Sequence, residues 1–345
     1  MTLRRRGTAA AALSLAAALA LTACGSSGDA DDTAGKDGGA GSKSVAQGGK
    51  DFGRVAEDTA KLGTDAKPGQ FPRTVTHALG RTEIKEAPKR VVVLDVGELD
   101  NVVSLGIKPV GWAPSEGSQD IPEYLKKDVG EPKSVGTINN LNLEAVNELK
   151  PDLILGSKLR AEKNYKDLSK IAPTVFSIRP GFTWKENYLL NAAALDRTAE
   201  AKKQLEAYGT KARKLGADLG EKKPTISMVR YLPQFTRLYA RQSFIGTILE
   251  DAGLPRPKIQ QADKLAVEIS PENIDKADGD WIFTGVYGDP DKTKRNAAED
   301  NPLWKNLQAV KDGHAKPVKD ETWYLGLGVT AADSVLDDLR GFLVK

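Results

Sequence analysis

Short apolar runs alternate with helical stretches twice along this chain, and this alternation is the strongest constraint on its fold. The first series lies between residues 91 and 178. Its apolar runs have the character of buried strands: Val91–Leu94, Lys108–Val110, Leu153–Leu155 and Thr174–Ile178. Its helical stretches are Glu98–Leu105, Asn142–Leu149 and Asn164–Ile171. Because continuous apolar strands separated by helices are typical of a parallel sheet covered on both faces, this series predicts one α/β lobe.

A second series of the same kind begins at Pro224 and predicts a second α/β lobe. Its predicted strands are Thr225–Tyr231, Arg237–Tyr239, Trp281–Thr284 and Lys316–Val318, and its predicted helices are Ser243–Ala252 and Thr330–Val344. Ahead of both series, Thr74–His77 and Arg81–Ile84 flank Leu79-Gly80 and predict a small hairpin.

The stretch between the two series, residues 183–219, predicts one long helix. It contains no proline, and apolar side chains recur in it at steps of three and four residues. At 1.5 Å per residue such a helix is roughly 55 Å long, which exceeds the size of one small lobe. We therefore expect it to join the two lobes, with a ligand cleft between them.

The first 70 residues have a different character. Residues 1–23 carry Arg4–Arg6 and then an Ala/Leu-rich run, as in a secretory signal peptide. Leu21-Thr22-Ala23-Cys24 resembles a bacterial lipobox, in which the cysteine is acylated and anchors the protein to the extracytoplasmic face of the membrane. The alternative is a simple signal peptide or anchor helix with an incidental cysteine. Residues 24–70 contain hardly a large apolar side chain, and we expect them to form a flexible tether.

The composition argues against several function classes. The 50 basic and 47 acidic residues balance once the three arginines of the signal are removed, so nucleic-acid binding has no electrostatic basis. One cysteine and two histidines are too few for a disulfide framework or the common zinc sites. Gly326–Ala331 satisfies G-x-G-x-x-A but lies too near Lys345 to open a dinucleotide-binding unit, and no G-x-S-x-G motif occurs. We therefore expect no enzymatic activity and no cofactor of the protein's own, and we expect a monomer because nothing in the sequence argues for oligomerisation. The alternative from another class is a small-molecule enzyme on an α/β scaffold.

One pattern occurs once in each predicted lobe. It is a helix cap, a glutamate two residues later and an aspartate eight residues after the glutamate: Asn142, Glu144 and Asp152, then Ser270, Glu272 and Asp280. From physics alone, each glutamate complements a helix dipole, which is worth about 0.3–1 kcal/mol.

Several runs, in this order, resemble the iron-siderophore and cobalamin binding proteins of ABC importers: Pro88–Leu94, Leu105–Gly111, Asn142–Glu144, Lys150–Ile154, Ala309–Gly313 and Trp323–Gly328. The resemblance covers Phe71 to the C-terminus. It implies Rossmann-like lobes at 71–182 and 221–345, a rigid connecting helix at 183–220, and a ligand held in a shallow cleft. It also implies that Glu144 and Glu272 pair with arginines of the permease dimer, which works with its ATPase.

A ferric siderophore brings six oxygen ligands of its own, so its carrier supplies aromatic surface and hydrogen-bond donors and no metal ligand. Loops that follow strands face the cleft in such an architecture. The candidate ligand contacts on such loops are Arg160, Arg179, Trp184, Arg230, Tyr231, Arg241, Phe244, Tyr287 and Trp323. Core packing of Trp184 and Tyr231, and a solvated position for Arg160, are equally compatible with the sequence. Aromatics outnumber basic groups, which favours a near-neutral ferric hydroxamate of the ferrioxamine type. Haem, cobalamin and ferric citrate are the alternatives.

Overall fold

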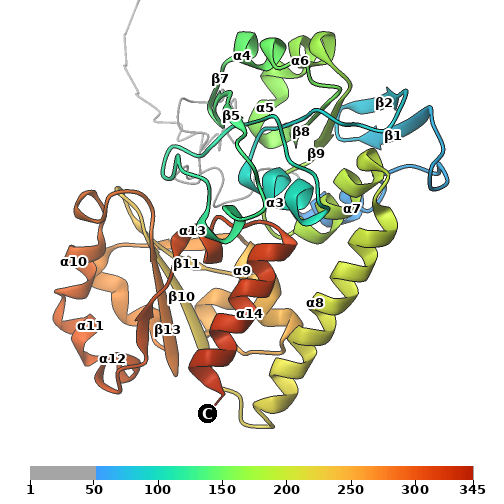
Figure 1. Cartoon of the computed structure of the whole chain (residues 1–345). Helices are drawn as coiled ribbons and strands as arrows, with labels where there is room; N and C mark the ends of the chain where they lie inside the picture. The colour runs from blue at the N-terminus through green and yellow to red at the C-terminus, as the bar shows by residue number, and fades with distance from the viewer. Residues whose placement is uncertain (1–51, 345) are drawn as a thin grey trace, which may run out of the picture. The chain divides into compact units, whose positions relative to one another are not determined.

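The computed structural model describes residues 52–344, and its first sheet confirms the first predicted α/β lobe (Figure 1). The strands are β3 Val91–Val93, β4 Gly111–Trp112, β5 Lys133–Ser134, β8 Leu153–Ser157 and β9 Thr174–Ser177. They are all parallel, in the order β5-β4-β3-β8-β9. The strand predicted at Lys108–Val110 lies three residues later, where Trp112 is buried.

Both faces of this first sheet are buried. Val91, Val93 and Leu155 belong to the cluster that contains side chains of α3 and α7, whereas Val92 and Ile154 belong to the cluster beneath α4 and α6. The helices and small strands of this region are α3 Val96–Ser104, η2 Glu123–Leu125, β6 Gly136–Thr137, β7 Asn140–Leu141, α4 Leu143–Glu148, α5 Lys158–Ala161, η3 Glu162–Asn164 and α6 Tyr165–Ile171.

The second sheet confirms the second predicted lobe but is mixed. Its strands are β10 Ile226–Tyr231, β11 Thr236–Tyr239, β12 Ala266–Ile269, β13 Trp281–Val286 and β14 Ala315–Pro317. The order is β12-β11-β10-β13-β14, in which β10, β13 and β14 are parallel and β11 is antiparallel to both of its neighbours. The helical segments are α9 Phe244–Asp251, η4 Lys258–Gln261, η5 Pro271–Ala277, η6 Pro290–Lys292, α10 Arg295–Glu299, α11 Pro302–Asn306, α12 Gln308–Lys311, α13 Asp320–Trp323 and α14 Val329–Leu343.

The repeated aspartates have the same structural role in the two lobes. The Asp152 carboxylate accepts hydrogen bonds from the backbone amides of Lys89 and Arg90, at 2.8 and 2.9 Å, just before β3. The Asp280 carboxylate accepts one from the amide of Thr225, at 2.6 Å, just before β10. Because β3 and β10 are the central strands of their sheets, the repeat marks equivalent positions in the two lobes.

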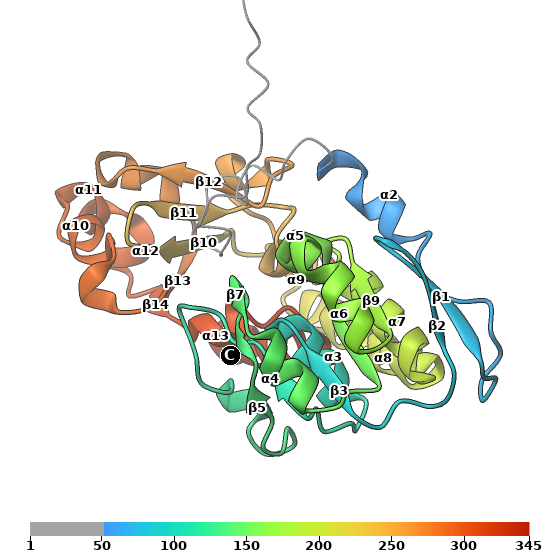
Figure 2. The same ribbon diagram turned by 90° about the horizontal axis from the view of Figure 1, so that it is seen from above.

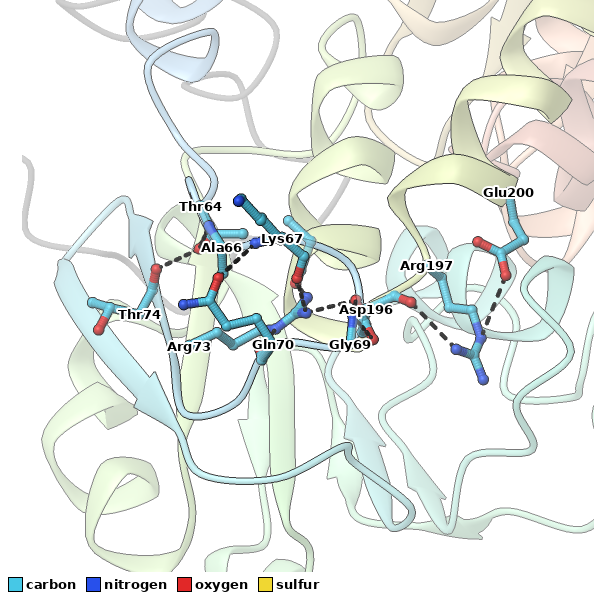
Figure 3. Close-up of polar contacts among 11 residues, drawn as sticks. Thr64, Ala66, Lys67, Gly69, Gln70, Arg73, Thr74, Asp196, Arg197 and Glu200 are labelled. Atoms are coloured by element: carbon cyan, nitrogen blue, oxygen red, sulfur yellow. Dashed lines mark hydrogen bonds and ion pairs between the residues drawn. The ribbon is translucent and has the colours of Figure 1, made fainter.

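The predicted single helix at 183–220 is wrong, because the chain forms two helices there, α7 Trp184–Leu195 and α8 Thr198–Asp218. Asp196 ends α7 in the left-handed conformation, at φ 58°, which aspartate tolerates better than most residues. Figure 3 shows what holds it there. Its carboxylate accepts hydrogen bonds from the Gly69 amide, at 2.9 Å, and from the buried Arg73 guanidinium, at 2.6 Å. The helix therefore breaks because a distant segment binds its end, a cause that helical periodicity does not record.

Helical structure occurs ahead of the hairpin, within the segment predicted to be a flexible tether. The segment η1 Phe52–Arg54 and α2 Val55–Thr59 precedes the hairpin of β1 Arg73–His77 and β2 Gly80–Ile84, which is confirmed. Phe52 and Val55 are both buried, and the Phe52 ring lies edge-on to Phe182 at 5.1 Å. The tether predicted to reach residue 70 is therefore wrong over 52–70, since these few apolar side chains are enough to dock the segment. The predicted signal peptide, Cys24 and the rest of the tether lie outside the described residues. Between residues 52 and 344, no helix is both long and apolar enough to cross a bilayer.

Candidate functional site

The candidate site lies where the carboxyl ends of the parallel strands of the two sheets come near each other. Viewed from above, the second sheet lies on one side and α3 to α7 on the other, with α13 between them (Figure 2). Tyr287, which follows β13, lies against the loop of the first lobe so closely that a Cβ on Gly117 would collide with its ring. Burial raises the pKa of the Tyr287 hydroxyl, and Arg230 of the second lobe and Arg160 of the first both act against this rise. Tyr287 therefore lies near enough to charged side chains of both lobes to interact with them electrostatically.

Arg230 is held rigidly at the end of β10. Its guanidinium makes a two-pronged ion pair with Asp320 of α13, at 2.6 and 2.5 Å, and donates a hydrogen bond to the Tyr239 hydroxyl at 3.0 Å. The Tyr287 ring lies 4.7 Å from it. Burial opposes its charge, but the interactions with Asp320 and Tyr239 outweigh this effect and raise the pKa of Arg230, so it stays charged.

Arg237 stands directly opposite Arg230 in the register of β10 and β11. Like charges in directly opposed positions destabilise a sheet. An acid on the outer side of each arginine offsets this repulsion. Asp320 pairs with Arg230, and Glu268, opposite Arg237 on β12, accepts a hydrogen bond from the Arg237 guanidinium at 3.1 Å. The Phe235 ring lies 4.9 Å from Arg237. The register therefore places the Arg230 and Arg237 side chains opposite each other on one face of the second sheet.

The first lobe contributes two further arginines. Arg160 in α5 pairs at 3.1 Å with Asp95, which follows β3 and caps α3. Burial lowers the pKa of Arg179, which follows β9, to about 10, and the charge of Arg160 adds to this effect. Burial and the Asp95 charge raise the pKa of Glu98 to about 8, so this carboxyl is protonated at neutral pH. Arginine is the side chain best suited to bind carboxylate oxygens, since its planar fork matches their geometry.

A pocket of about 580 Å³ opens beside the Arg230–Asp320 pair. Gly117, Ser118 and Glu123 line it from the first lobe. The second lobe contributes Val286, Gly288, Lys319, Asp320 and Glu321. Over residues 52–344, no group of three or more His, Cys, Asp or Glu side chains is placed to hold a metal ion.

A family model described as periplasmic binding protein matches residues 91–322, which is more than half of the chain. This chain belongs to the periplasmic binding protein family. The chain is 38% identical over 287 residues to the probable siderophore-binding lipoprotein YfiY of Bacillus subtilis, covering 79% of this chain and 88% of that protein. It is 32% identical over 285 residues to the Fe(3+)-citrate-binding protein YfmC of the same organism, covering 80% and 88%. The crystal structure of Staphylococcus aureus SirA complexed with staphyloferrin B superposes with a TM-score of 0.70 at 36% identity, covering 78% of this chain and 98% of that one.

Four aromatic side chains predicted to contact a ligand are packed in the cores of this periplasmic binding protein, and we correct that prediction. Trp184, Phe244 and Trp323 belong to the largest core cluster and Tyr231 to the cluster beneath α10 to α12, so each packs among apolar side chains. The Trp184 indole donates to Thr247 at 2.9 Å, and that of Trp323 donates to Asp338 at 2.9 Å.

Arg241 is also displaced from the predicted site, for a topological reason. Arg241 follows the carboxyl end of β11. Because β11 is antiparallel to β10, this loop lies at the opposite end of the strands from Arg230. There Arg241 is 44% exposed and pairs with Glu250 and Asp263. The same antiparallel turn brings Arg237, which the sequence prediction missed, to the site edge. The signal was Pro233-Gln234 between two strand-like runs, which indicates a hairpin.

Of the nine predicted contacts, Arg160, Arg179, Arg230 and Tyr287 lie at the ends of strands or on the loops that follow them, on the side where the lobes face each other. Glu144 and Glu272, predicted to meet a permease, are both exposed in the first turns of α4 and η5. The Asn142 side chain caps α4 by accepting from the Ala145 amide at 3.0 Å.

Proposed function

We propose that this chain is the substrate-binding component of an ABC importer, which captures a ferric siderophore outside the membrane and delivers it to a permease. The supporting facts are the family membership and the similarity to relatives whose names state siderophore and Fe(3+)-citrate binding. Iron is then the cargo, wrapped in the oxygen atoms of its chelator. Capture and release need no bond making by the protein, so the proposal includes no enzymatic step.

The opposed arginines Arg230 and Arg237 carry our proposal for the ligand class. Each arginine has an acid partner on its outer side, and an anionic oxygen placed near both arginines would accept hydrogen bonds from two charged donors at once. We therefore favour a ferric complex with carboxylate donors over the near-neutral hydroxamate that the sequence alone favoured. The name of the relative YfmC, an Fe(3+)-citrate-binding protein, supports the same choice.

Isothermal titration of the protein with ferric citrate, ferrioxamine B, haem and cobalamin tests this proposal. We expect saturable binding of ferric citrate that weakens as salt is raised, because charge pairing is screened. Binding of ferrioxamine B alone would overturn the carboxylate class and leave the importer role standing. Binding of haem or cobalamin alone, or of none of the four, would overturn the siderophore assignment.

We further propose that Glu144 and Glu272 dock on the permease and that an acylated Cys24 anchors the chain, which acts as a monomer. Reversing both charges, Glu144→Lys with Glu272→Lys, should abolish most uptake of radiolabelled iron while leaving ligand affinity unchanged. Glu206→Lys on α8, an equally exposed glutamate, is the matched control and should transport normally. Normal uptake by the double variant would refute the docking assignment. Replacing Cys24 by Ala should release the protein from membranes.

A further inference from the structure

Asp100 makes a contact that joins the two lobes. It lies in α3 of the first lobe, with no exposed surface. Its two carboxylate oxygens accept hydrogen bonds from the backbone amides of Thr330 and Ala331, each at 3.0 Å, in the first turn of α14. A carboxylate at a helix N-terminus is stabilised both by these otherwise unpaired donors and by the helix dipole.

The approach of the two segments is close. A Cβ on Gly328, the residue before α14, would collide with the Asp100 carboxyl group. The backbone of Gly328 is extended, with φ −144°, so any residue tolerates its conformation and only the available space requires glycine. The Tyr124 hydroxyl of the first lobe donates to the Gly326 carbonyl at 3.3 Å in the same loop.

The rest of α14 is fastened to the second lobe and to α8, beside which it runs (Figure 1). Arg340 pairs with Asp218 at the end of α8 at 2.6 Å, and Lys211 of α8 pairs with Asp337 at 2.8 Å. The Trp323 indole binds Asp338. Holding the N-terminus of α14 therefore holds the second lobe relative to the first.

We infer that Asp100 is a positioning residue for ligand capture: by fixing α14 to α3, its carboxylate sets how far Arg160 and Arg179 stand from Arg230 and Arg237. The effect on ligand affinity rests on the proposed function, whereas the effect on lobe separation does not. A ligand that spans both lobes binds best when the lobes already stand at the bound distance, because no free energy is then spent on bringing them together.

The surroundings of Asp100 make its charge sensitive to mild acid. The titratable groups that act on it or are acted on by it are Tyr124 of η2, Tyr188 of α7 and Asp333 of α14. Burial raises the pKa of Asp100 to about 6, against the lowering effect of the Thr330 and Ala331 amides. Protonation leaves one oxygen carrying a hydrogen that faces a backbone donor. The contact should therefore weaken as the pH falls through about 6.

The test measures lobe separation and affinity in the same variants. Spin labels on Lys166→Cys in α6 and Asp312→Cys after α12 report the distance between lobes in the full chain carrying Cys24→Ser, since Cys24 is the only native cysteine. Asp100→Asn replaces one acceptor by a donor that opposes a backbone amide. Asp128→Asn removes a charge from the pocket beside the same contact and is the matched control. Gly328→Ala is a second variant, which leaves the carboxylate in place but displaces it.

We expect Asp100→Asn and Gly328→Ala to broaden the distance distribution of the unliganded protein and to weaken ferric citrate binding about fivefold or more. The affinity difference between wild type and Asp100→Asn should shrink below pH 6. Unchanged distances in both variants would overturn the inference, and so would unchanged affinity with a lowered melting temperature. If wild type binds none of the ligands tested, the proposed function fails, but the distances still decide whether Asp100 positions the lobes.

Discussion

Removing the negative charge of Glu268 should strengthen the binding of an anionic ferric complex. Glu268 partners Arg237 at 3.1 Å on the outer side of the opposed arginines. In Glu268→Gln, the amide oxygen still accepts a hydrogen bond from Arg237, so the arginine keeps its place. The charge that competed with the ligand is gone.

The size of the effect follows from Coulomb's law. Two unit charges about 7 Å apart in a medium of effective dielectric constant near 20 interact by about 2 kcal/mol. Because the Glu268 side chain is 22% exposed, we reduce this to about 1 kcal/mol for screening. Affinity for ferric citrate should then rise about fivefold. Arg237→Gln should lower it by at least as much. The loss of the charged pair should reduce the free energy of unfolding by about 1 kcal/mol in either variant.

Titration calorimetry at two salt concentrations measures these changes. Glu250→Gln is the control, because Glu250 carries the same charge in the same lobe and pairs with Arg241 at the opposite edge of the sheet. It should leave affinity unchanged. An unchanged or weakened affinity in Glu268→Gln would refute our claim that the opposed arginines bind an anionic group.

Three further predictions concern stability. Asp196→Ala should lower the free energy of unfolding by about 3 kcal/mol in urea titrations, because it leaves the Arg73 guanidinium, 2% exposed, without its carboxylate partner; a loss below 1 kcal/mol would contradict this. Burial lowers the pKa of His77 to about 4, so the free energy of unfolding should fall by about 2 kcal/mol as the pH falls from 6.5 to 4. In His77→Gln, the free energy of unfolding should depend less on pH over this range. Phe52→Ala should increase amide exchange over residues 52–59 without changing exchange in the sheets, because the Phe52 ring packs on Arg179 and Phe182.

The sequence predicted the central strands well because apolar runs report burial on both faces of a sheet. Three strands are buried over most of their length and consist mainly of apolar residues: Val91–Val93, Leu153–Ser157 and Trp281–Val286. The strand β12 was missed because its two middle residues, Val267 and Glu268, are only half-buried at a sheet edge. Edge strands lack the continuous apolar pattern, so composition alone does not distinguish them from loops.

The site was predicted less well because it depends on strand direction. Arg241 and Phe244 were assigned to the cleft because they follow a predicted strand, a reason that holds only where that strand is parallel to its neighbours. One antiparallel turn moves them to the far edge and replaces them by Arg237. The break between α7 and α8 is likewise absent from any periodic pattern, because it depends on the contact between Asp196 and the distant residue Gly69.

The repeated glutamates differ from the repeated aspartates in a way that favours an external partner. Asp152 and Asp280 have an internal role in both lobes, since each accepts from the amides that precede a central strand. Such a role explains their recurrence. The dipole explanation for the glutamates fits Glu144, in an α-helix capped by a side chain, better than Glu272, in a 3₁₀ turn without such a cap. The local structures differ while the exposed carboxylate recurs, which supports our proposal that both glutamates dock on a permease.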